Sequence, residues 1–160
     1  MKKTISLILV TVLALCLFTG CTPKAPVDTS PDKVRIVMEA AEHTPEHNWL
    51  YRYEDGVSAD GTRLSVEEML AKTEGSRVIP APFTVVTGNA LENGAFSIYD
   101  LEGNLIGQRM TFSVPEEGGE YLCVMELTFG TEKEYEGYQF FFRFSVEEEE
   151  VYCDDPTHNH

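Results

Sequence analysis

The segment GEYLCVMELTFGTEKEYEGYQFFFRFSV runs from Gly119 to Val146 and contains two long runs with alternating apolar positions. The apolar face of each run is made of the following residues: Tyr121, Cys123, Met125, Leu127 and Phe129 in the first, and Tyr138, Phe140, Phe142, Phe144 and Val146 in the second. Alternation with a period of two is typical of β-strands. A polar loop over 130–137 separates the runs, which predicts an antiparallel hairpin with one face on a core and the other facing water.

Shorter strand patterns precede this hairpin. They lie at 34–38, 49–53, 83–87, 96–98 and 110–114. One helix is predicted from Leu64 to Lys72, because Ser65 and Glu68 have the spacing of a capping box. One helix is too few for the crossovers of a parallel sheet, so we expect a mostly β, antiparallel sandwich with one short helix.

The stretch Gly119-Glu120-Tyr121-Leu122-Cys123 resembles the Gly-x-Tyr-x-Cys pattern of immunoglobulin-like domains. The resemblance implies an immunoglobulin-like sandwich in which the Tyr121 hydroxyl binds upstream backbone as a tyrosine corner. It implies no inter-sheet disulfide at Cys123, because residues 22–122 contain no cysteine.

The N-terminus has the order of an export signal. Lys2 and Lys3 precede an apolar run over 5–18, and small residues lead to Cys21. The stretch 17–21 resembles the lipobox of bacterial lipoproteins, although Phe18 stands where that family usually has a small aliphatic residue. The resemblance implies cleavage before Cys21, lipid on Cys21, and a location on the extracytoplasmic side of the cell membrane.

The chain is therefore expected to divide into four parts. Residues 1–20 form the signal peptide, and 21–32 form a lipidated cysteine with a Pro-rich tether. Residues 33–150 form the sandwich domain, and 151–160 form an acidic and His-containing tail.

The stretch from Trp49 to Val146 is also similar to domains of uncharacterised Gram-positive exported proteins. The shared features are Trp49, Asp55-Gly56, Gly119 with Tyr121, and Gly137-Tyr138 leading to Phe144. The similarity implies a fold and a location, and it implies no activity.

The charge of the chain limits its partners. The formal net charge is −15, and removal of residues 1–20 with Lys2 and Lys3 makes it about −17. Such a chain repels nucleic acid, whose binding depends on neutralised phosphates. It also repels anionic lipid headgroups, so the lipid itself must supply the membrane attachment.

Two cysteines remain for the exported domain once Cys16 is removed and Cys21 is lipidated. Cys123 and Cys153 are a candidate disulfide, because exported proteins meet oxidising conditions. The alternative is a buried free thiol at Cys123, which lies in an apolar strand pattern.

Metal and catalytic motifs are poorly represented. Weak metal candidates gather at the C-terminus: Asp154, Asp155, His158 and His160. His43 and His47 are four residues apart, but Pro45 between them favours a solvated loop. The chain contains no Gly-x-Ser-x-Gly and no Gly-rich phosphate loop, so we expect no cofactor and no enzymatic activity.

Aromatic residues are the remaining lead. Trp49, Tyr51 and Tyr53 alternate and form a candidate binding strip. Together with Tyr135 and Tyr138, they include more aromatic residues than one core needs. We expect a binding or accessory module for an envelope protein or glycan. The alternatives are that the rings fill the core and its rim, that paired carboxylates make a small envelope hydrolase, or that the domain is a sensor or inhibitor of an envelope system.

Overall fold

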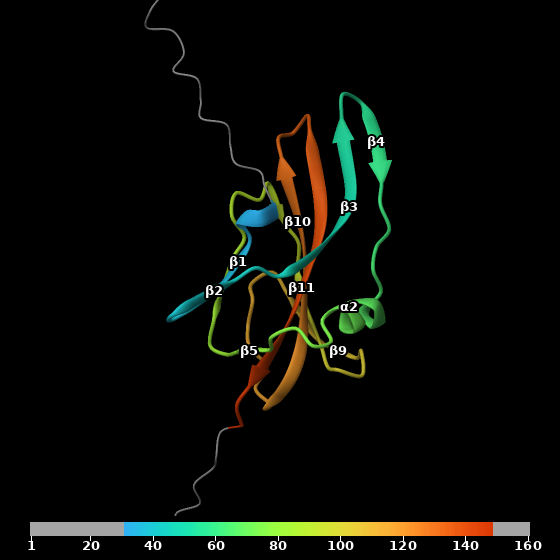
Figure 1. Cartoon of the computed structure of the whole chain (residues 1–160). Coiled ribbons are helices and arrows are strands. Elements are labelled where there is room, and N and C mark those ends of the chain that lie inside the picture. The colour runs from blue at the N-terminus through green and yellow to red at the C-terminus, as the bar shows by residue number, and fades with distance from the viewer. Residues whose placement is uncertain (1–30, 149–160) are drawn as a thin grey trace, which may run out of the picture.

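The computed structural model describes residues 31–148 and is built around one long hairpin (Figure 1). Strands β10 (Gly119–Gly130) and β11 (Tyr135–Val146) pair antiparallel along their full lengths. The predicted hairpin is confirmed, but its loop is shorter than expected. Both strands continue into the polar segment, which leaves only residues 131–134 as the connection.

The larger sheet has the strand order β4-β3-β11-β10-β8-β9. Its further strands are β3 (Glu46–Glu54), β4 (Val57–Asp60), β8 (Phe96–Tyr99) and β9 (Leu105–Arg109). Two short strands join beside this path: β5 (Ile79–Pro80) pairs parallel with β11, and β7 (Glu92–Asn93) pairs antiparallel with β10.

The smaller sheet has the order β2-β1-β6 and follows the 3-10 turn η1 (Pro31–Lys33). Its strands are β1 (Arg35–Met38), β2 (Ala41–His43) and β6 (Thr84–Val86). Val34 and Ile36 are fully buried and pack with the alternating face of the hairpin in one core, as expected. Two mainly antiparallel sheets with a shared core and one short helix confirm the predicted mostly β sandwich.

The predicted tyrosine corner is present. The hydroxyl of Tyr121 donates a hydrogen bond of 2.9 Å to the backbone oxygen of Glu117, four residues upstream. This bond ties the start of β10 to the loop before it, which is the role that the immunoglobulin-like resemblance assigned to Tyr121.

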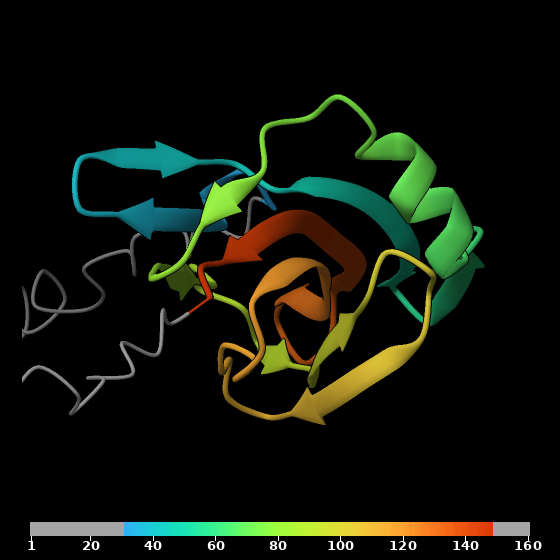
Figure 2. The same cartoon turned by 90° about the horizontal axis from the view of Figure 1, so that it is seen from below.

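The face of the hairpin opposite the main core was predicted to meet water. This prediction was wrong, because part of that face is covered. The helix α2 (Val66–Lys72) covers part of it, beginning at the Ser65 N-cap with the expected capping box to Glu68. Met69 of the helix packs with Phe141 and its neighbours in a second apolar cluster. Figure 2 shows α2 at one side of the curved large sheet, away from the β1–β2 hairpin.

The prediction of a strand at 110–114 is also wrong. The neighbouring strand is β9, and Phe112 enters the core from a loop, with its ring 4.8 Å from Phe83 and 5.7 Å from Phe144. Met110 remains 68% exposed. The alternation therefore reflected one partly buried aromatic side chain that packs on the core, and no paired strand.

The prediction of a solvated loop around His43 and His47 is also wrong. His43 lies in β2 and His47 in β3, and the His47 ring lies 5.6 Å from that of Phe140. Pro45 is itself buried, so the segment joins two strands across the edge of the core.

Candidate functional site

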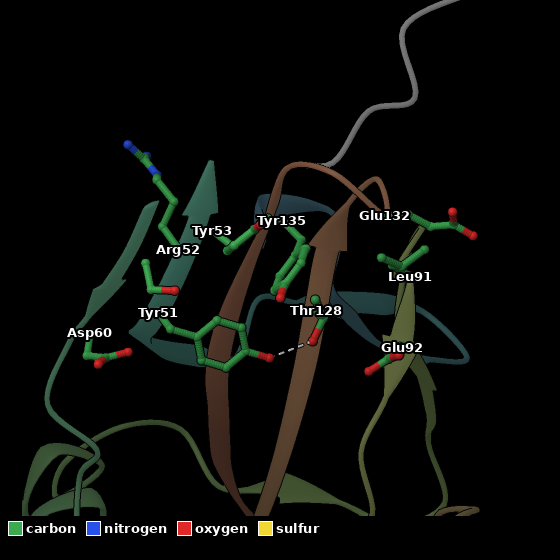
Figure 3. A pocket seen from close by; sticks show the side chains of 10 residues that line it. Tyr51, Arg52, Tyr53, Asp60, Leu91, Glu92, Thr128, Glu132 and Tyr135 are labelled. Atoms are coloured by element: carbon green, nitrogen blue, oxygen red, sulfur yellow. Dashed lines mark hydrogen bonds between the residues drawn. The ribbon is translucent and has the colours of Figure 1, made fainter. Parts of the chain in front are cut away.

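A concave cleft of about 560 Å³ opens beside the upper ends of β3, β10 and β11 (Figure 3). Its lining residues are Tyr51, Arg52, Tyr53, Ser58, Asp60, Leu91, Glu92, Thr128, Glu132 and Tyr135. They come from β3, β4, β7 and its preceding residue, and the two hairpin strands with their loop. Its volume lies in the range of small-ligand sites.

The floor of the cleft depends on Gly137. Strand β11 lies between β3 and β10, and the Tyr51 ring passes over Gly137 to reach Thr128, where the two hydroxyls are 2.8 Å apart. A Cβ at position 137 would lie 2.2 Å from Cζ of Tyr51. A side chain there would therefore push the ring away. Glycine at position 137 is what allows the Tyr51 ring to lie across β11.

Three tyrosine rings meet within the cleft. Tyr53 and Tyr135 are stacked, with centroids 5.2 Å apart and planes at 19°. Tyr51 meets Tyr135 edge to face at 6.3 Å and 83°. All three are half-buried, so the cluster is held by its own contacts while part of each ring reaches solvent.

Acidic side chains flank the tyrosines on both sides of the cleft. Asp60, Glu92 and Glu132 come from three separate segments and are exposed. Within residues 31–148, the structure shows no ion pair or hydrogen bond from these three carboxylates. Figure 3 shows Asp60 on the β4 side, and Glu92 and Glu132 on the other side.

The one basic side chain of the lining is engaged elsewhere. Arg52 pairs with Glu136 on β11, and its guanidinium also lies 3.9 Å from the carboxylate of Glu54. Figure 3 shows the Arg52 guanidinium pointing away from the cleft. The Glu136 carboxylate also accepts a 2.6 Å hydrogen bond from Tyr138, and burial followed by this bond raises the pKa of Tyr138 to about 12.

The structure divides the predicted aromatic strip. Tyr51 and Tyr53 line the cleft, but Trp49 does not. A register shift lies between them, because Trp49 pairs with Tyr138 and Tyr51 pairs with the adjacent Gly137. Trp49 instead packs against Gly61, where a Cβ would lie 2.6 Å from its ring.

Several cleft residues were not predicted as site residues. Tyr135 stood out only as a surplus aromatic, while Thr128, Leu91 and the three carboxylates gave no local signal. Gly137 was assigned to the polar loop, and the structure places it inside β11, where a glycine often marks a close approach of another group.

Cys123 faces the core and is fully buried, and this desolvation raises the pKa of its thiol. A buried thiol without a basic neighbour is a poor nucleophile. Its candidate partner Cys153 lies outside the described residues.

Other predicted sites also lie outside residues 31–148. They are Cys21 and the weak metal candidates Asp154, Asp155, His158 and His160. Among the described residues, no group of three or more His, Cys, Asp or Glu side chains could hold a metal ion. Within the same range, none of the helices has the length and apolar character needed to cross a membrane.

No protein-family model, no curated protein and no solved structure matches the chain. We therefore infer the function from the chemistry of the cleft.

Proposed function

We propose that this chain is a non-enzymatic binding module on the extracytoplasmic side of a bacterial membrane, and that the tyrosine-lined cleft is its binding site. The observation that carries the binding proposal is the grouping of Tyr51, Tyr53 and Tyr135 around one cavity. Rigid aromatic rings supply contact area at a low cost in conformational entropy, which is why binding surfaces are rich in tyrosine.

A binding role suits the acidic groups better than catalysis does. A carboxyl that acts as a general acid near neutral pH needs an apolar, water-poor surrounding. Asp60, Glu92 and Glu132 are instead exposed to solvent. Cys123 is buried in the core and so is remote from any substrate in solution.

The anchor proposal is supported by the sequence alone. Cys21 follows a basic start and an apolar run, and prolines occur soon after it. Lipid on Cys21 would hold the acidic domain near a surface that its own charge repels. Replacement Cys21→Ala is expected to move the protein from the membrane fraction to the soluble fraction, and unchanged membrane association would contradict the anchor.

Photo-cross-linking in the envelope tests the cleft itself. Benzoylphenylalanine replaces Leu91, which lines the cleft and is 43% exposed. The matched control replaces Leu105 on β9, which is 55% exposed and lies outside the cleft. We expect a discrete adduct from position 91 only, and its loss when Tyr53→Ala is added. Equal adducts from both positions, or none from position 91, would contradict the proposal.

A further inference from the structure

The charge distribution around the cleft is unbalanced. Asp60, Glu92 and Glu132 reach the same cavity from β4, β7 and the hairpin loop, while the Arg52 charge is turned to Glu136. Three like charges around one concavity repel one another and create a focused negative potential. A ligand with positive charge removes this repulsion when it binds.

A bare metal ion does not fit this arrangement. No cluster of three metal-ligating side chains exists within the described part of the chain. Hard cations such as Ca²⁺ need six to eight oxygen ligands close together. In the cleft, Asp60 lies on one side, and Glu92 and Glu132 lie on the other (Figure 3). A ligand that complements these charges must therefore be larger than a single ion.

The tyrosines identify the kind of cation. Ammonium and guanidinium groups are attracted to the faces of aromatic rings, and arginine also stacks on them through its planar guanidinium. The stacked pair Tyr53–Tyr135 and the edge of Tyr51 provide an aromatic corner beside the acidic rim. A long basic side chain can place its aliphatic stem on the rings and its charged end near the carboxylates.

We infer that the cleft binds a basic peptide segment, with an arginine or lysine side chain against Tyr53 and Tyr135 and its charge between Asp60 on one side and Glu92 and Glu132 on the other. This inference rests on the proposed function, since it names the ligand class of the same cleft. The volume of about 560 Å³ accommodates a few residues of such a segment. Exposed carboxylates supply attraction over about 10 Å at moderate salt, so they also steer the ligand to the rings.

Calorimetric titration of the lipid-free mature chain (Cys21→Ala) tests the inference. The probe is acetyl-Gly-Arg-Gly-Gly-amide, and the matched probe has citrulline in place of arginine, which keeps the shape and removes the charge. We expect the citrulline peptide to bind about tenfold more weakly. Equal affinity for the two peptides would overturn the inference.

Variants separate the ring contribution from the charge contribution. Tyr53→Phe keeps the ring face and should retain binding, whereas Tyr53→Ala should weaken it about tenfold. The triple change Asp60→Asn, Glu92→Gln and Glu132→Gln should weaken binding by a similar factor and remove most of its salt dependence. Glu42→Gln, on an exposed position of β2 outside the cleft, is the matched control and should bind as wild type. Loss of binding in the control to the same extent would overturn the inference.

A third probe distinguishes this inference from the broader proposal. Chitotetraose is a neutral aromatic-stacking ligand. If it binds and depends on Tyr53 while the arginine peptide does not bind, the cationic ligand is wrong and the binding module stands. If neither probe binds and position 91 gives no cross-link, both proposals fail.

Discussion

The hydroxyl of Tyr51 on β3 lies 2.8 Å from the hydroxyl of Thr128 on β10, although β11 lies between these strands. The connection passes over Gly137, the residue of β11 that pairs with both Tyr51 and Thr128. One phenol thereby bridges three strands and fixes the floor of the cleft. A binding site gains precision when its side chains are held by such supporting contacts.

The first prediction concerns Gly137→Ala. A Cβ would lie 2.2 Å from the Tyr51 ring, so the ring must move and its bond to Thr128 must break. We expect a loss of about 1–3 kcal/mol in the free energy of unfolding. Urea unfolding followed by the fluorescence of Trp49, the single tryptophan, measures this change.

A double-mutant cycle tests whether Tyr51 is the cause. In a Tyr51→Ala background, Gly137→Ala should become nearly neutral, because the ring that it displaces is gone. Gly107→Ala on β9 is the control, since nothing lies within 4 Å of a Cβ there. An equal cost of Gly137→Ala with and without Tyr51 would show that the clash is not the reason.

The second prediction concerns the helix-covered face. Phe141 is 1% exposed and packs with Met69, Leu122 and Val124. Phe141→Ala should cost about 3–5 kcal/mol in unfolding free energy. Val57→Ala, at a 68% exposed position, should change it by less than about 0.5 kcal/mol. A cost for Phe141→Ala below about 1 kcal/mol would mean that α2 does not cover this face in solution.

The long hairpin was predictable because each of its two runs, 121–129 and 138–146, alternates over nine positions. Tyr121 and Phe144 were assigned to the core face from this pattern, and both are buried there. The helix was predictable because the Ser65–Glu68 capping box is a local interaction. These features depend on neighbours in sequence, which a single chain displays directly.

The rest depends on contacts between distant segments. Phe141 lies on the face that was expected to meet water, because nothing near it in sequence reveals that α2 covers it. Trp49 was grouped with Tyr51 because the register shift against β11 leaves no trace in β3 itself. The cleft combines Asp60, Leu91 and Tyr135, which only the strand order brings together.

The third prediction concerns alkaline pH. Burial and the bond to Glu136 raise the pKa of Tyr138 from 10.0 to about 12. The unfolded chain therefore loses this proton first, and stability should fall as pH rises from about 10 to about 12. Tyr138→Phe should flatten this fall in urea unfolding at a series of pH values. A steeper fall in the variant than in wild type would contradict the assignment.

The fourth prediction concerns Cys123. With Cys21→Ala and Cys153→Ser, it is the single cysteine of the mature chain. Because burial raises the pKa of its thiol, native protein should react with a thiol reagent only at the rate of unfolding. Urea should accelerate the reaction. Rapid labelling in native buffer would contradict the buried position of this side chain.

The most direct test of the central claim is NMR mapping of the arginine peptide on the ¹⁵N-labelled, lipid-free mature chain. We expect shifts of backbone amide signals at Tyr53, Leu91 and Tyr135, with signals of β9, such as that of Ile106, unchanged. The citrulline peptide at the same concentration should cause much smaller shifts. Shifts centred on β9, or no shifts at the three cleft positions, would contradict the assignment of the cleft as the binding site.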